Sequence, residues 1–163
     1  MAEQITDGTD IAGITGITDT ATRRPARADR GEDVPRSTTL ALPGDAGSIA
    51  AAREHARTFL DRVQPALPGS VIEDAVLAIS ELVTNVVRHA PGPCTLRLEV
   101  DERAVHIAVS DTSRELPRLR SPHAGMVGGF GLPMVFSLAH QVETRVHDAG
   151  KTVSVSLSRD RGD

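Results

Sequence analysis

A carboxylate and a carboxamide four residues apart are the side chains of this sequence best suited to chemistry. They are Glu81 and Asn85, in the stretch ELVTNVVRHA at 81–90. Residues at i and i+4 lie side by side on one face of a helix, so the two groups would project together. An amide oxygen such as that of Asn85 can be a single protein ligand for Mg²⁺, which prefers octahedral oxygen coordination completed by phosphates and waters. Glu81 could act as a general base toward a hydroxyl or water. The alternative is an ordinary solvated face of an amphipathic helix.

A glycine cluster is the second feature that could bind a ligand. Gly128-Gly-Phe-Gly131 precedes an expected helix from Leu132 to about residue 140, with Pro133 tolerated in its first turn. Backbone N–H groups and the helix dipole at such a start favour an anion, phosphate included. The cluster is no Walker loop, because no Gly-Lys-Ser/Thr follows, and no βαβ unit surrounds it. A flexible turn is the alternative.

For three further side chains the sequence pattern indicates a functional role less specifically. Asp111 follows a strand beside the glycine loop, and its carboxylate could accept a hydrogen bond from an exocyclic amine, which would select adenine over guanine. Capping of a loop is the alternative. Thr152, in Gly150-Lys-Thr, is by default an ordinary strand residue after a hairpin turn. The single cysteine, Cys94, excludes an internal disulfide and a cysteine-based metal site, and is expected to be a buried bystander. The six histidines have no metal-ligand spacing.

Hydrophobic periodicity predicts the elements that position these residues. A helix from about 46 to 63 is capped by Asp45, and a central helix from about 71 to 90 has Ser70 and Glu73 as a capping box and stops at Pro91. Strands are expected at 37–42, 95–100, 105–109, 142–146 and 152–157. The core-facing stripe of the central helix is predicted to be Ile72, Ala75, Val76, Ile79, Leu82, Val83, Val86 and Val87. The order β-α-α-β-β-loop-α-β-β predicts an α+β fold, a two-layer sandwich with helices on one face of a mainly antiparallel mixed sheet.

Composition limits the class of protein. The chain has 163 residues, enough for one domain with a real core, and no apolar run or signal segment that would place it in or across a membrane, so a cytoplasmic location is expected. A net charge of −4 and 2% aromatic residues disfavour nucleic-acid binding. Residues 1–36 are expected to be a disordered tail, 37–158 the folded domain, and 159–163 a short C-terminal tail.

Together these motifs closely resemble one family. ELVTN followed by RHA, Asp111 after an alternating strand, Gly-Gly-Phe-Gly-Leu132 and Gly-Lys-Thr152 are similar to the motifs of the GHKL, or histidine-kinase-like, ATPase superfamily. Within it, the chain looks closest to bacterial anti-sigma-factor serine-protein kinases and actinobacterial ATP-binding regulatory proteins. The resemblance covers about residues 38–158 and implies the Bergerat-type ATP-binding fold.

The resemblance implies a role for each matching residue. Asn85 would hold Mg²⁺ between the phosphates of ATP, and Glu81 would activate a serine or threonine hydroxyl on a partner protein. Asp111 would read the adenine amine, with Thr152 beside it. The phosphates would be cradled by Gly129, Gly131 and the N–H of Leu132, with 112–127 as a lid.

Two points complicate that assignment. His89 belongs to the family motif and is counted with the nucleotide-binding residues, although its place on a helix alone favours a surface or packing role. The superfamily often has glycines after its adenine-reading aspartate, whereas here the sequence is DTSRELP at 111–117, a short form that resembles the actinobacterial branch. The missing glycines after Asp111 make the affinity for ATP the first property that this difference from the superfamily would change.

Two functions follow from the resemblance. One is a cytoplasmic Mg-ATP-dependent serine/threonine-protein kinase that phosphorylates a STAS-type anti-anti-sigma protein and sequesters a sigma factor. It would act in transcription regulation, and the resemblance includes a homodimer among its expected states. The other is an ATP-binding regulatory partner-switch module without phosphotransfer. A sensor histidine kinase is disfavoured, since no helical dimerisation segment with a phospho-accepting histidine is expected before the domain. Gyrase- or chaperone-like ATPases would need further transducer domains.

Overall fold

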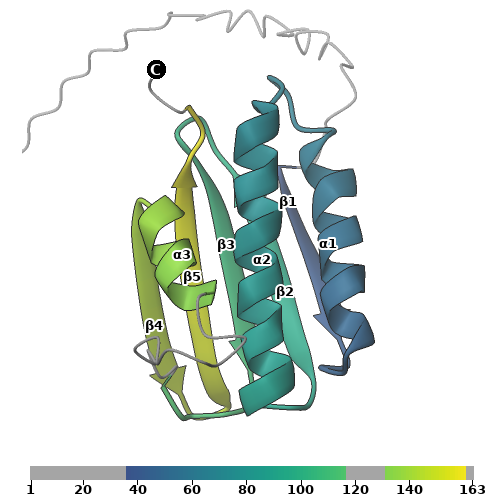
Figure 1. Ribbon diagram of the computed structural model, residues 1–163, viewed down its shortest axis with the longest axis vertical. Helices are drawn as coiled ribbons and strands as arrows, with labels where there is room; N and C mark the ends of the chain where they lie inside the picture. Colours follow the sequence, from purple (N-terminus) through teal and green to yellow (C-terminus); the bar gives the residue numbers. More distant parts are fainter. Residues whose placement is uncertain (1–35, 117–130, 161–163) are drawn as a thin grey trace, which may run out of the picture. The chain divides into compact units, whose positions relative to one another are not determined.

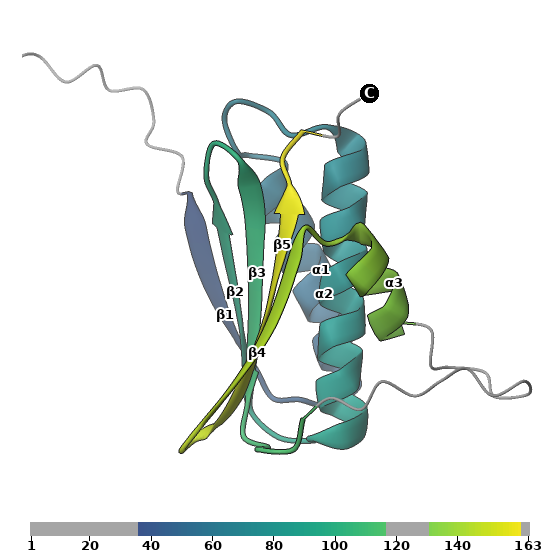
Figure 2. The same ribbon diagram turned by 90° about the vertical axis from the view of Figure 1, so that its left-hand side faces the viewer.

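A five-stranded sheet with three helices on one of its faces makes up the computed structural model, which describes residues 36–116 and 131–160 (Figures 1 and 2). The strand order is β1-β2-β3-β5-β4, and all four pairings are antiparallel. The strands are β1 (Ser37–Leu42), β2 (Cys94–Val100), β3 (Ala104–Asp111), β4 (Gln141–His147) and β5 (Gly150–Ser158). The helices are α1 (Gly47–Leu60), α2 (Gly69–His89) and α3 (Gly131–Leu138). The predicted α+β sandwich is confirmed, although no parallel pair occurs among the described strands.

The core lies between α2 and the inner face of the sheet. Alternation of side chains along each strand sends every second residue toward the helices, so Leu98, Ile107 and Val155 form a cross-strand row that is fully buried. The inner face of the three central strands consists of Cys94, Leu96, Leu98, Val100, Val105, Ile107, Val109, Val153, Val155 and Leu157, all buried. The outer face carries small and polar residues, such as Thr95, Ala108 and Ser154.

Helix α2 lies in the middle of the helical layer and packs against α1, α3, β3 and β5. Six of the eight residues predicted for its stripe are buried, while Ile72 and Val87 are only partly buried. Val71 and Ala78, which were not predicted, are buried as well. The predicted capping box is wrong. The helix already begins at Gly69, with Pro68 as N-cap and no side-chain cap, so Ser70 lies inside the first turn, too late to cap it.

Helix α1 begins at Gly47 with Ala46 as N-cap, so the predicted cap, Asp45, lies one position before the N-cap. Asp45 Oδ1 accepts hydrogen bonds from the backbone N–H and the hydroxyl of Ser48, at 3.1 and 3.2 Å. The helix ends at Leu60, three residues earlier than expected, while Val63 is still buried beneath the following turn. The last helix, α3, runs from Gly131 to Leu138 rather than from Leu132 to about residue 140.

Several expectations concern residues outside the described ranges. The tail at 1–36 lies outside them except for Arg36, and so does the proposed lid from residue 117 onward, with Gly129. Within the described ranges, none of the helices is both long enough and apolar enough to span a bilayer.

Candidate functional site

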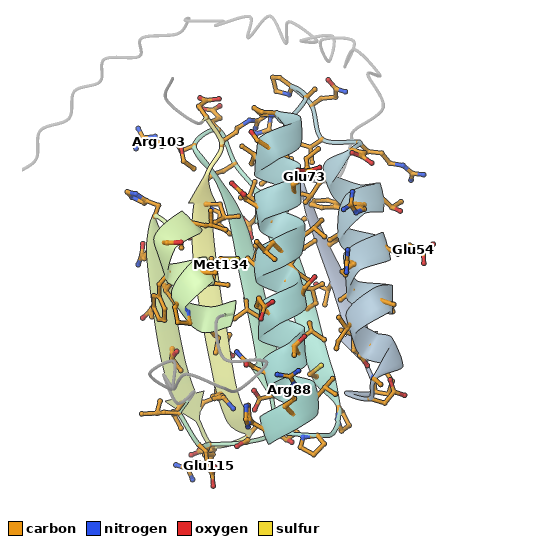
Figure 3. The ribbon with its side chains drawn as sticks, viewed as in Figure 1. Glu54, Glu73, Arg88, Arg103, Glu115 and Met134 are labelled. Atoms are coloured by element: carbon orange, nitrogen blue, oxygen red, sulfur yellow. The ribbon has the colours of Figure 1, made fainter. Side chains whose placement is uncertain are left out.

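The C-terminal half of α2 and the end of β3 lie at the same end of the sandwich. In Figure 3, Arg88 near the end of α2 and Glu115 just beyond β3 mark this end, whereas Glu73 and Arg103 mark the opposite one. Because β3 ends at Asp111, its carboxylate belongs to the end of the molecule where α2 presents Asn85 and His89. The fold thus gathers the α2 motif and Asp111 into one region.

Glu81 and Asn85 have half-buried side chains that make no hydrogen bond with the described part of the chain. Their neighbour Ser80 differs, since its hydroxyl donates to the carbonyl of Val76 at 2.7 Å. One turn further on, Arg88 and His89 are exposed. A carboxylate and a carboxamide that are one turn apart, half-buried and without partners among the described residues suit contact with a ligand.

Asp111 is a buried carboxylate with one oxygen committed to the protein. Its Oδ1 accepts from Lys151 Nζ at 2.9 Å and from the backbone N–H of Ser113 at 2.8 Å. The Asp111 side chain is 3% exposed and the Lys151 side chain is 8% exposed. Lys151 is the only lysine in the 163-residue chain. Charged pairs this buried are found where hydrogen bonds satisfy both partners.

The structure does not bring Thr152 to Asp111. In the β3–β5 register Asp111 is opposite Lys151, and Thr152 is opposite Ser110. Thr152 therefore points to the outer face, where its Oγ1 lies 2.8 Å from Ser110 Oγ and 3.2 Å from His147 Nε2. The residue beside the Asp111 carboxylate is Lys151, which sequence reasoning missed. Counting back by two from the apolar residues Val155 and Val153 would have placed it on the inner face.

Gly150 allows β5 to start directly against the backbone of Asp111. It has φ +147°, and a Cβ built at this position would lie 1.8 Å from the Asp111 carbonyl oxygen. Only glycine tolerates both the backbone conformation and the contact. The glycine of the Gly-Lys-Thr motif thus positions Lys151 opposite Asp111.

Cys94 lies buried at the start of β2, close enough to Asp111 to respond to its charge. Burial raises the pKa of the thiol, and the negative charge of Asp111 raises it further. The thiol is therefore protonated at neutral pH, which disfavours a role as nucleophile.

A comparison with protein families settles the relationship suggested by these motifs. The histidine kinase-like ATPase domain family matches residues 42–157. The chain belongs to this family. Its membership implies that the domain binds ATP.

Two solved structures resemble this histidine kinase-like ATPase domain. The first contains the RsbU and RsbW domains of Rv1364c from Mycobacterium tuberculosis, with 22% identity, a TM-score of 0.57, and coverage of 77% of this chain and 33% of that one. The second is the histidine kinase domain of the blue-light activated kinase EL346 from Erythrobacter litoralis, with 18% identity, a TM-score of 0.46, and coverage of 72% and 62%. This chain therefore spans about a third of the first structure. A comparison with curated proteins found no match.

The side chains of the candidate site suit a metal ion that needs few protein ligands. No cluster of three or more His, Cys, Asp or Glu residues that could hold a metal occurs in the ranges 36–116 and 131–160. A protein site built on the Asn85 oxygen alone suits an ion such as Mg²⁺, whose other ligands can be phosphate oxygens and waters.

The expected phosphate-binding segment is only partly within the described residues. Gly131 and Leu132 form the first turn of α3, while Gly129 lies outside the described ranges. The start of a helix suits a phosphate because its first N–H groups have no intrahelical acceptor. Phosphate binding by Gly129, Gly131 and Leu132, and nucleotide contact by His89 and Thr152, stay predictions.

Proposed function

We propose that this protein is a cytoplasmic Mg-ATP-dependent serine/threonine-protein kinase of the anti-sigma-factor type. It transfers the γ-phosphoryl group of ATP to a STAS-type anti-anti-sigma protein and sequesters a sigma factor when that partner is phosphorylated. The observation that carries the proposal is that Glu81 and Asn85 are half-buried, one helical turn apart, and without hydrogen bonds to the described chain. A half-buried carboxylate without a partner among the described residues has no structural benefit that the fold displays.

In this proposal each residue has a separate task. Asn85 contributes its amide oxygen to the ion, which neutralises charge on the phosphates when bound. Glu81 accepts the proton of the serine hydroxyl as that oxygen bonds to the γ-phosphorus and ADP leaves. Asp111 holds the adenine through its exocyclic amine. Phosphoryl transfer relies mainly on positioning and electrostatics, so this small set of side chains is sufficient.

The sigma-factor pathway is supported by one structural neighbour. The Mycobacterium tuberculosis protein with the similar fold contains RsbU and RsbW domains, and this chain corresponds in length to one part of it. An ATPase domain with a motif for phosphotransfer is in keeping with a regulator that acts on partner proteins.

The kinase activity is tested with labelled ATP and a STAS protein encoded beside this chain. Wild type should label a serine or threonine of the partner, and Glu81→Ala should lose transfer by roughly 100-fold or more, as expected for removal of a general base. ATP affinity should be unchanged in Glu81→Ala. Glu73→Ala is the matched control, because Glu73 is exposed at the opposite end of the same helix. Equal transfer by the Glu81 variant and wild type would refute the role of Glu81.

The second candidate is an ATP-binding partner-switch module without phosphotransfer. It is favoured by residues 112–117, which directly follow Asp111 and include no glycine, and by the ion pair that occupies Asp111 Oδ1. Here the wild type would bind the partner tightly in an ATP-dependent way without labelling it. Glu81→Ala would leave partner binding intact in a pull-down assay, while Asn85→Ala would weaken it through loss of ATP.

A further inference from the structure

The inner face of the sheet ends in a row of residues that includes the only lysine. Across the strands, Lys151 on β5 has Asp111 on β3 as one register partner and Val146 on β4 as the other. Register partners point to the same face of a sheet. Lys151 therefore lies between a buried carboxylate and an apolar side chain.

The ion pair has hydrogen-bonding capacity left over. An ammonium group has three donors, and Lys151 Nζ uses two of them, on Asp111 Oδ1 at 2.9 Å and on the Ser113 carbonyl at 3.4 Å. Asp111 Oδ2 makes no hydrogen bond with the described residues. Within the ranges 36–116 and 131–160, one donor of Nζ and the acceptor Oδ2 thus remain without a partner.

The side of Lys151 nearest β4 is less covered than the side nearest β3. Val146 on β4 is 42% exposed, whereas the Asp111 side chain on β3 is 3% exposed. Because Val146 belongs to the inner face, an apolar surface adjoins the ion pair there without a described helix covering it. A flat aromatic ring could lie against Val146 with its polar edge toward the ion pair.

We propose that Lys151 reads the nucleotide base together with Asp111. Oδ2 accepts from the N6 amine of adenine, and Nζ donates to N1, the acceptor next to that amine on the ring. This inference rests on the proposed binding of ATP and assigns its base contact to Lys151 in place of Thr152, whose side chain is on the other face. A direct contact from a charged donor makes N1 part of the recognition.

The same pair disfavours 6-oxopurines. Guanine and hypoxanthine have an acceptor at position 6 and an N–H at position 1, the reverse of adenine. In the same orientation they would place an oxygen against the Asp111 carboxylate and an N–H against the Lys151 ammonium. Unmatched buried polar groups reduce affinity more than a simple missing contact does. Lys151 and Asp111 therefore act jointly as a selector for adenine.

The test compares ATP with 1-deaza-ATP, in which N1 is replaced by C–H. Wild type should bind 1-deaza-ATP roughly 10- to 100-fold more weakly than ATP in calorimetric titrations, the range for a hydrogen bond to a charged group. Lys151→Met should bind the two nucleotides with similar affinity. Arg145→Met is the control, since Arg145 is an exposed cation on β4 opposite Thr152; it should keep the wild-type preference.

A second measurement avoids any effect of the Lys151 variant on folding. Labelling lysine side chains with ¹⁵N gives one ammonium signal in the wild-type protein, because the chain has one lysine. ATP should shift this signal, and 1-deaza-ATP should shift it less. Equal binding of the two nucleotides by wild type, tighter binding of ITP than ATP, or an unshifted ammonium signal with ATP bound would overturn the inference. Failure of wild type to bind ATP at all would instead overturn the proposed function.

Discussion

Asp111 and Lys151 form a buried ion pair across β3 and β5, with Oδ1 2.9 Å from Nζ. The pair occupies the end of the inner face, beyond a core made of valine, leucine and isoleucine side chains. Gly150 brings the two strands together at this point. The only lysine of the chain therefore lies beside the carboxylate that we expect to bind adenine.

Removing one partner of the pair should cost more stability than removing both. Lys151→Met leaves the Asp111 charge buried without compensation, which costs about 3–5 kcal/mol for a typical buried pair. Asp111→Asn combined with Lys151→Met removes both charges and should recover a large part of the loss. Urea unfolding of the wild type, both single variants and the double variant measures the coupling. Additive losses would mean that the two charges do not interact.

Sequence patterns were sufficient for the strand and helix order because nearly every element buries one regular stripe. The alternation Val105, Ile107, Val109 predicted β3, and the stripe of α2 is almost unchanged in the structure. The site residues on these elements, Glu81, Asn85 and Asp111, therefore fell at the same end of the molecule. What the patterns predicted well was the placement of whole elements.

Details that depend on one residue were harder to predict. Thr152 was expected beside Asp111, but a single step along a strand reverses the direction of a side chain, and Lys151 holds that position. The capping box at Ser70 failed for a similar reason, since α2 begins at Gly69. Residues 117–130 had no regular period from which their contacts could be derived.

Asn85→Ala should reduce ATP binding specifically in the presence of magnesium. The variant loses the amide oxygen proposed as the protein ligand of the ion. If that contact is as strong as a hydrogen bond to a charged group, its loss costs about 1.5–3 kcal/mol of binding free energy, or roughly 10- to 150-fold in Kd. Calorimetric titration with ATP, with Mg²⁺ and with EDTA, measures the difference. In EDTA the variant and wild type should bind alike. An equal loss under both conditions would mean that Asn85 does not act through the ion.

Gly150→Ala should strongly destabilise the protein. The added Cβ would meet the Asp111 carbonyl oxygen at 1.8 Å and force a φ of +147° on a residue that disfavours it. We expect a loss of more than about 3 kcal/mol, the larger values for strained or overpacked sites. Gly69→Ala is the control, because a Cβ there meets nothing within 4 Å and alanine favours a helix. Equal melting temperatures for the two variants in thermal unfolding would contradict the close contact between Gly150 and Asp111.

Cys94 should be unreactive at neutral pH and should make folding pH-dependent in alkali. Its folded pKa is above the ordinary value of 9.0 because of burial and the Asp111 charge. The stabilising preference for the protonated thiol is therefore fully present below pH 9 and is lost as the pH rises through the folded pKa. Native protein should react slowly with a disulfide reagent at pH 8 and quickly in urea.

The influence of Asp111 on that thiol can be measured separately. Asp111→Asn removes the nearby negative charge, so the pKa of Cys94 should fall relative to wild type. Thiolate absorbance followed against pH in the two folded proteins gives the comparison. A higher pKa in the Asn variant would show that the assigned direction is wrong.

The most direct test of ATP recognition at this site is the Kd of ATP for wild type, Asp111→Asn and Asp101→Asn, measured by calorimetry with Mg²⁺ on proteins shown to be folded. Asp101 is the control, since its carboxylate accepts backbone N–H groups in the β2–β3 turn at the opposite end of the sheet. We expect one ATP per chain, a Kd weakened roughly 10-fold or more by Asp111→Asn, and a Kd unchanged by Asp101→Asn. Equal ATP affinities in all three proteins, or no ATP binding by wild type, would contradict ATP recognition at this site.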